Sequence, residues 1–227
     1  MVKVKLIFVL IFLALFFSCF EKIETVESPH DLHFEKMPDK WYEAIPLGNG
    51  IIGALVWQKD KNLHISIDRS DLWDLRPLEN LNSPKFKFTW VYRQWKNKTY
   101  RKVQEQFDIP YNLYPAPTKI PAGAIEFPLK NIPKISNIHL FLNDALCQIT
   151  LENGNKIFIF VQADKNAGWF IFEDIKINPI IITPGYNDEN STLSKLEYEP
   201  PIIKKGINHI KYIQKGWDGF KYEINIK

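Results

Sequence analysis

Residues 138–172, IHLFLNDALCQITLENGNKIFIFVQADKNAGWFIF, decide the fold of this chain. Short runs rich in branched and aromatic residues alternate here with polar turns, which is the pattern of β-strands. Asn153-Gly154 lies between two of these runs, and this dipeptide favours the tight turn of a β-hairpin. The stretch therefore predicts consecutive antiparallel strands rather than a parallel sheet.

The pattern of short strands continues on both sides of this stretch. Residues 51–57 and 64–68 predict a second hairpin, which is followed by a loop over residues 71–82. Residues 183–206 are polar, contain Gly and Pro, and predict a long loop. The strands that we expect in the second half of the chain are 124–129, 138–142, 147–152, 156–161, 168–173, 175–182, 209–213 and 219–226. Regularly spaced strands of this kind predict an all-β fold, an antiparallel β-sandwich.

One segment departs from the strand pattern. Apolar residues recur at helical spacing over residues 88–107, FTWVYRQWKNKTYRKVQEQF. Lys96-Asn97-Lys98 in the middle of this segment favours two short helices over one. Pro110 is expected to end the helical part, because residues 110–121 hold four prolines and predict an extended loop. The sandwich is therefore expected to carry a short helical insertion.

The N-terminus has the features of an export signal. Two lysines precede an unbroken apolar run over residues 6–17, which is short for a membrane span. Ser18 directly before Cys19 resembles a bacterial lipobox, so we expect residues 1–18 to be a lipoprotein-type signal peptide and Cys19 to be lipidated. An ordinary secretory signal and an uncleaved anchor are the alternatives. The polar residues 19–36 predict a tether, and residues 37–227 form the domain. If Cys19 is lipidated, we expect the chain to be an exported, membrane-anchored lipoprotein in the periplasm or at the cell surface.

Composition limits the classes of function. The chain has 227 residues and a formal net charge of +3, which is too small for a general nucleic-acid-binding surface. Cys147 is the one cysteine left beside the lipidated Cys19, so no internal disulfide is expected. The five histidines are scattered without metal-ligand spacing, and neither a metal nor another cofactor is predicted. Residues 48–53 fit GxGxxG superficially, but a strand follows them instead of the helix of a dinucleotide site.

Acidic and aromatic side chains are the remaining candidates for chemistry. Asp68, Asp71 and Asp74 lie close together, and a glycosidase needs two carboxyl groups, although aspartates in turns more often cap backbone groups. Seven tryptophans suit a carbohydrate-binding protein, because indole faces stack on sugars. Trp73 and Trp217 lie in polar loops and are candidates for such a surface. Three others are expected in the core: Trp57, Trp95 and Trp169.

A family resemblance joins these observations. Residues 41–57, WYEAIPLGNGIIGALVW, and residues 64–74, HISIDRSDLWD, resemble the N-terminal β-sandwich domain of glycoside hydrolase family 95, which contains α-L-fucosidases. Members of this family more often have Leu-Asn-Glu at the positions of Asp68-Arg69-Ser70. The similarity continues through the helical segment, PAGAIEF at residues 121–127, and the Asp144-Ala145 step.

The resemblance implies a supersandwich that is not catalytic by itself. In this family the acid and base carboxylates lie in an (α/α)6 barrel after the sandwich, so no catalytic residue is carried over to this chain. We expect a truncated or split product whose partner is the missing catalytic domain, and which is inactive alone. Gly48, Asn49 and Gly50 form either a tight structural turn or part of the rim of the sugar pocket. The candidates for that rim are Gly48, Asn49, Gly50, Asp71, Trp73 and Trp217.

Two other functions stay open. The chain is alternatively a stand-alone carbohydrate-binding lipoprotein that holds an oligosaccharide or polysaccharide on Trp73 and Trp217. The third hypothesis is a small enzyme that uses Asp68 and Asp71.

Overall fold

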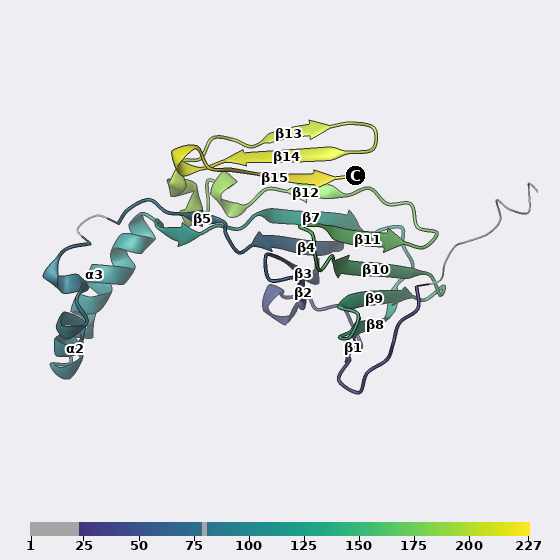
Figure 1. Cartoon of the computed structure of the whole chain (residues 1–227), viewed down its shortest axis with the longest axis horizontal. Coiled ribbons are helices and arrows are strands. Elements are labelled where there is room, and N and C mark those ends of the chain that lie inside the picture. The colour runs from purple at the N-terminus through teal and green to yellow at the C-terminus, as the bar shows by residue number, and fades with distance from the viewer. Residues whose placement is uncertain (1–22, 79–80) are drawn as a thin grey trace, which may run out of the picture.

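The computed structural model describes residues 23–78 and 81–227. Two five-stranded antiparallel sheets form the body of the molecule (Figure 1). In spatial order, the first sheet contains β1 (Leu32–Phe34), β8 (Ile135–Phe141), β9 (Leu146–Leu151), β10 (Lys156–Val161) and β11 (Gly168–Phe172). The second contains β12 (Ile180–Ile182), β7 (Gly123–Pro128), β4 (Asn62–Arg69), β3 (Ile52–Lys59) and β2 (Ile45–Gly48).

Both sheets bury one face in a common core, which confirms the predicted all-β, antiparallel sandwich. Alternation along the strands supplies this face, since every second residue points to the same side of a sheet. The second sheet contributes Ile45, Val56, Leu63 and Ile65, and the first contributes Ile138, Cys147, Ile149, Ile157 and Ile159. Cys147 is fully buried, as its strand position predicts.

The two predicted hairpins are confirmed. β9 and β10 pair across the Asn153-Gly154 turn, where Gly154 has the positive φ of +89° that favours this residue. β3 and β4 pair from Ile52 opposite Arg69 to Lys59 opposite Asn62. The loop expected over residues 71–82 contains one short strand, β5 (Trp73–Asp74), which pairs with β6 (Thr118–Lys119).

A third sheet lies beside the sandwich and contains β13 (Ile202–Lys205), β14 (Ile210–Lys215) and β15 (Lys221–Ile226). The prediction of a long loop over residues 183–206 is wrong where β13 forms. The same stretch also contains two 3-10 helices, η3 (Gly185–Asn187) and η4 (Thr192–Leu196). β13 is an edge strand with all four residues exposed, so its sequence lacks the alternation that marks a half-buried strand. Another 3-10 helix, η5 (Trp217–Gly219), connects β14 to β15.

A second core joins this sheet to the β5–β6 pair. Its buried residues are Leu72, Ala116, Ile120, Ala122, Tyr186 and Leu196. Phe220, Tyr222 and Ile224 of the C-terminal hairpin pack against them. The hydroxyl of Tyr222 donates a hydrogen bond of 2.7 Å to the carbonyl oxygen of Ala122, which fixes the third sheet against the segment that leads into β7.

The helical insertion is confirmed as two helices that project from one end of the sandwich (Figure 1). They are α2 (Phe88–Lys96) and α3 (Tyr100–Leu113), and the predicted turn lies between them. The short η2 (Pro84–Phe86) precedes α2, and η1 (Trp41–Glu43) precedes β2. The prediction that Pro110 ends the helical part is wrong, because α3 continues to Leu113. Proline has a φ that is compatible with a helix, although it lacks one hydrogen-bond donor. The last turn closes through a hydrogen bond from the N–H of Tyr114 to the carbonyl oxygen of Pro110.

Two further boundaries differ from the prediction. The strand expected over residues 175–182 is limited to Ile180–Ile182. At the N-terminus, β1 pairs with β8 inside the segment expected as a tether. The predicted signal peptide at residues 1–18 and the lipidation site Cys19 lie outside the described residues. In the described ranges, no helix is long and apolar enough to cross a membrane.

Candidate functional site

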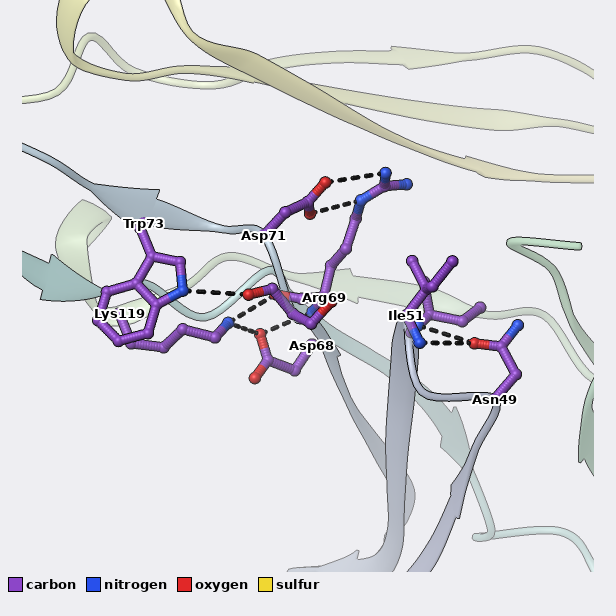
Figure 2. Close-up of polar contacts among 9 residues, drawn as sticks. Asn49, Ile51, Asp68, Arg69, Asp71, Trp73 and Lys119 are labelled. Atoms are coloured by element: carbon purple, nitrogen blue, oxygen red, sulfur yellow. Dashed lines mark hydrogen bonds and ion pairs between the residues drawn. The ribbon is translucent and has the colours of Figure 1, made fainter.

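The two motifs of the family resemblance meet at one end of the second sheet (Figure 2). Residues 48–50 form the turn between β2 and β3, and residues 70–73 follow the end of β4. The backbone N–H of Ser70 donates a hydrogen bond of 2.8 Å to the carbonyl oxygen of Ile51, which joins the two segments. We call this region, residues 48–52, 68–73 and Lys119, the motif end of the sandwich.

Asn49 organises the β2–β3 turn. Its Oδ1 atom accepts hydrogen bonds of 3.0 Å from the backbone N–H groups of Ile51 and Ile52. Gly50 has a φ of +88°, a conformation that residues with a side chain rarely adopt. At Gly48 an added Cβ atom would lie 3.0 Å from the carbonyl oxygen of Ile52. One glycine thus provides the conformation of the turn, and the other allows the backbone to approach closely.

The other end of the Asn49 amide reaches the opposite sheet. Its Nδ2 atom donates to the carbonyl oxygens of Gln162 at 2.9 Å and Lys165 at 3.0 Å, in the loop between β10 and β11. Both polar atoms of the side chain therefore have two partners within the domain, which is the arrangement of a structural turn. This geometry favours the structural interpretation of Gly48, Asn49 and Gly50 over a free sugar-binding rim.

Asp71 and Asp68 are each held by a cation. The Nε and Nη2 atoms of Arg69 donate to the two carboxylate oxygens of Asp71 at 2.6 and 3.0 Å. Lys119 Nζ lies 2.5 Å from Asp68 Oδ1 and also donates to the carbonyl oxygen of Arg69 at 2.7 Å. Hydrogen bonding to Arg69 lowers the pKa of Asp71 from its ordinary value. A general acid of a glycosidase needs a raised pKa, so this environment does not suit Asp71 for that role.

Trp73 lies at the surface of the motif end. Its Nε1 atom donates a hydrogen bond of 3.0 Å to the carbonyl oxygen of Ser70, and 47% of the residue is exposed. Its strand partner is Lys119. The indole is therefore held in one orientation by its strand and its hydrogen bond, while its ring stays accessible to a ligand. Trp217, in η5, is also partly exposed.

The expectation for three other tryptophans is only partly met. Trp57 is half-buried, and its Nε1 atom donates to Ser66 Oγ at 3.1 Å. Trp95 and Trp169 are about half exposed, so their expected place in the core is wrong. Trp169 stacks on Phe160 at the surface of the first sheet, and Trp95 lies on the free face of α2. Amphipathic spacing identifies an apolar face, but it does not show whether another part of the chain covers that face.

The structure has a buried ion pair beside the motif end that the sequence did not predict. Asp74 in β5 is almost fully buried, and its Oδ2 atom lies 3.0 Å from Arg76 Nε. Tyr198 donates a hydrogen bond of 2.6 Å to the same oxygen, and Arg76 Nη2 donates to the carbonyl oxygen of Leu196 at 2.5 Å. Asp74 is thereby a structural residue that connects β5 to η4 and the approach to the third sheet. Tyr198 is too distant in sequence for spacing to reveal the contact.

The outer face of the second sheet carries a groove with a volume of about 490 Å³. Small residues form much of its floor, and three prolines, Pro46, Pro121 and Pro184, line it. His64 also lines the groove and forms a buried pair with Glu126, with 2.7 Å between Nδ1 and Oε1. Asn62 Nδ2 donates to the other oxygen of Glu126 at 2.7 Å. The Glu126 carboxylate is thus bonded on both sides, as expected for a buried charged group that stabilises the strand pairs.

Over residues 23–78 and 81–227, no buried side-chain nitrogen or oxygen lacks a hydrogen-bond partner. The same residues contain no group of three His, Cys, Asp or Glu side chains that could hold a metal ion. The side chains of Asn49, Asp68 and Asp71 are thus bonded within the domain, and the indole of Trp73 is a large exposed aromatic surface beside them. Comparisons with known proteins add no family: no family model matches the chain, and no curated protein matches it.

Proposed function

We propose that this chain is the exported N-terminal, non-catalytic domain of an enzyme similar to glycoside hydrolase family 95. Its function is to pack against a catalytic (α/α)6 barrel, in the same chain or in a separate one, and to help shape the pocket for the sugar. The enzyme would hydrolyse O-glycosidic bonds, as α-L-fucosidases do.

One observation carries this proposal. The two segments of the resemblance, residues 41–57 and 64–74, meet at the motif end, where Ser70 donates to Ile51 and Asn49 bonds to the opposite sheet. Motif residues that serve as internal supports fit a scaffold better than a catalytic centre. The two exposed aspartates agree with this interpretation, because each is paired with a cation and Asp71 has a lowered pKa.

The coding sequence downstream of Lys227 tests the proposal most directly. We expect it to encode a helical barrel, either in the same reading frame or as a neighbouring gene. If a separate barrel chain exists, it should co-purify with this protein when both are expressed together. The absence of a barrel in every frame and of any co-purifying glycosidase would contradict the proposal. Hydrolysis of an aryl fucoside or aryl galactoside by the purified chain alone would contradict its non-catalytic part.

The half-exposed Trp73 favours a second candidate function, a carbohydrate-binding lipoprotein that acts alone. An indole face stacks on the C–H face of a sugar, and the bond to Ser70 keeps this ring in place. Trp73→Ala should then abolish binding of a fucosylated oligosaccharide in calorimetry, and Trp217→Ala should weaken it. Trp169→Ala is the matched control, because this tryptophan is equally exposed on a different sheet. Unchanged binding in the Trp73 and Trp217 variants would eliminate an aromatic platform.

A further inference from the structure

The helices α2 and α3 expose apolar side chains that nothing in the described residues covers. Gln94 is the one buried residue in the two helices, and Figure 1 shows both helices projecting away from the sheets. Phe88, Tyr92 and Trp95 are 78%, 49% and 56% exposed. Solvent-exposed apolar groups of this size usually mark a surface that contacts a partner or a membrane.

Three of these side chains form a continuous strip along α2. Phe88, Tyr92 and Trp95 follow each other at helical spacing and lie on one face of the helix. Their ring centroids are 6.0 Å apart between Phe88 and Tyr92 and 5.6 Å apart between Tyr92 and Trp95. We call these three residues the aromatic strip.

The same insertion has a concentrated excess of basic charge. Residues 84–113 contain seven lysines and arginines and two acidic residues, which is a net charge of +5, whereas the whole chain has +3. The rest of the chain is therefore slightly acidic. All the basic residues of the insertion are exposed, and they are Lys85, Lys87, Arg93, Lys96, Lys98, Arg101 and Lys102. This charge is complementary to an anionic partner.

The shape and composition of the insertion favour a lipid surface as that partner. Protein interfaces are depleted in lysine, and four of the five lysines here lie at or next to the strip on α2. Single-stranded nucleic acids, which are linear polyanions, are held in grooves. The aromatic strip instead belongs to α2, a helix that projects from the sandwich. Helices that lie in a membrane interface combine Trp and Phe on one face with Lys and Arg on the other.

We propose that the α2–α3 insertion docks on an anionic membrane surface. The aromatic strip enters the boundary between the headgroups and the acyl chains, and Arg93 and Lys96 lie at the lipid phosphates. This inference depends neither on a catalytic partner nor on lipidation of Cys19. In Figure 1 the insertion projects at one end of the molecule, away from β1.

A fluorophore placed in the strip tests the docking in the full chain. Cys19→Ser removes the first cysteine, and Cys147 is buried with its pKa raised to about 12, so a cysteine introduced by Tyr92→Cys is the one that reacts. The labelled protein is reconstituted into vesicles of phosphatidylglycerol and phosphatidylcholine. We expect a blue shift of the emission and quenching by brominated acyl chains. The same label at Ile207→Cys, in the exposed β13–β14 turn, should show neither change.

Charge variants then separate an anionic lipid surface from the alternatives. The pair Arg93→Gln and Lys96→Gln should lower the ratio of docked to undocked protein by roughly 30-fold, because each basic residue near an anionic surface contributes about 1 kcal/mol. Absence of a shift in these vesicles, or an equal shift in vesicles of phosphatidylcholine alone, would overturn the proposal. A blue shift caused by alginate in the absence of lipid would overturn it in favour of an acidic glycan.

Discussion

Asn49 and Gln162 connect the two sheets of the sandwich: Nδ2 of Asn49, in the β2–β3 turn, donates a hydrogen bond of 2.9 Å to the backbone carbonyl oxygen of Gln162, just after β10. A single side chain thereby closes its own turn and ties that turn to the opposite sheet.

Asn49→Ala removes four hydrogen bonds and leaves backbone groups of two loops without partners. We expect the free energy of unfolding to fall by about 2–3 kcal/mol. Urea denaturation followed by tryptophan fluorescence measures this loss. Asn153→Ala is the control, because that side chain accepts one bond, from the backbone of Asn155, in an exposed turn. A loss at Asn49 no larger than at Asn153 would mean that the contact between the sheets contributes little.

Gly50→Ala forces a residue with a Cβ atom into a φ of +88°. The expected loss of stability is about 1–2 kcal/mol, since left-handed backbone is unfavourable for L-residues. Gly53→Ala is a matched control two strand positions into β3, where the added Cβ would lie 3.8 Å from its nearest contact, the carbonyl oxygen of Leu47. Thermal unfolding of the two variants should therefore differ clearly, and equal melting temperatures would contradict the role of the turn.

Asp74→Asn and Asp71→Asn should have unequal effects, although both remove an aspartate from an ion pair with arginine. Asp74 is buried with Arg76, and its loss leaves a largely buried cation without a counter-charge, which costs about 3 kcal/mol. Asp71 pairs with Arg69 at the surface, and its loss costs under about 1 kcal/mol. Urea unfolding of both variants measures the difference, and similar losses would contradict the distinction between the two pairs.

The carboxyl group of Asp71 should titrate below the ordinary range of aspartate, because Arg69 stabilises its ionised form. Since the pKa is lower in the folded state, the pair stabilises the fold above the ordinary aspartate pKa. This contribution is lost as the pH falls through the lower, folded value. Carboxyl-detected NMR measures the pKa directly. Arg69→Gln should raise it back towards the ordinary range, whereas Lys119→Gln, which removes a weaker influence, should raise it less.

Cys147 should not react with thiol reagents in the native protein. Burial raises the pKa of its thiol to about 12, so the reactive thiolate is scarce and inaccessible at neutral pH. In a Cys19→Ser background, a chromogenic disulfide should show no rapid reaction until denaturant is added. Rapid labelling of the native protein would indicate that the core opens near β9.

Much of the sandwich could be predicted from local pattern alone. The β9–β10 hairpin and the β3–β4 hairpin combine alternation with a clear turn, so their strands lie where the sequence places them. β13 could not be found, because an edge strand exposed on both faces has no alternating apolar face. The helix through Pro110 was missed because proline usually breaks a helix, whereas α3 continues past it with one backbone donor fewer and closes through the N–H of Tyr114.

The sequence motifs predict which residues form the motif end, apart from Lys119, but not the contacts between them. The motifs identified Asn49, Asp71 and Trp73, which indeed lie at one end of the sandwich. Their partners could not be inferred: Gln162 bonds to Asn49 across 113 residues, and Lys119 bonds to Asp68 across 51. Such contacts depend on how the sheets pack against each other, and the local spacing of residues in the sequence does not indicate this packing.

The β5–β6 pair has a consequence for how this molecule can vary. Trp73 opposite Lys119 and Asp74 opposite Thr118 bring the beginning and the end of the helical insertion to one place. Residues 75–117 therefore begin and end at one place, and Arg76 and Asn112 also bond to η4, at Leu196 and Lys195. This segment could be lengthened, shortened or exchanged for another without changing the register of either five-stranded sheet. Natural variation and engineering can thus alter what this protein touches while its scaffold stays the same.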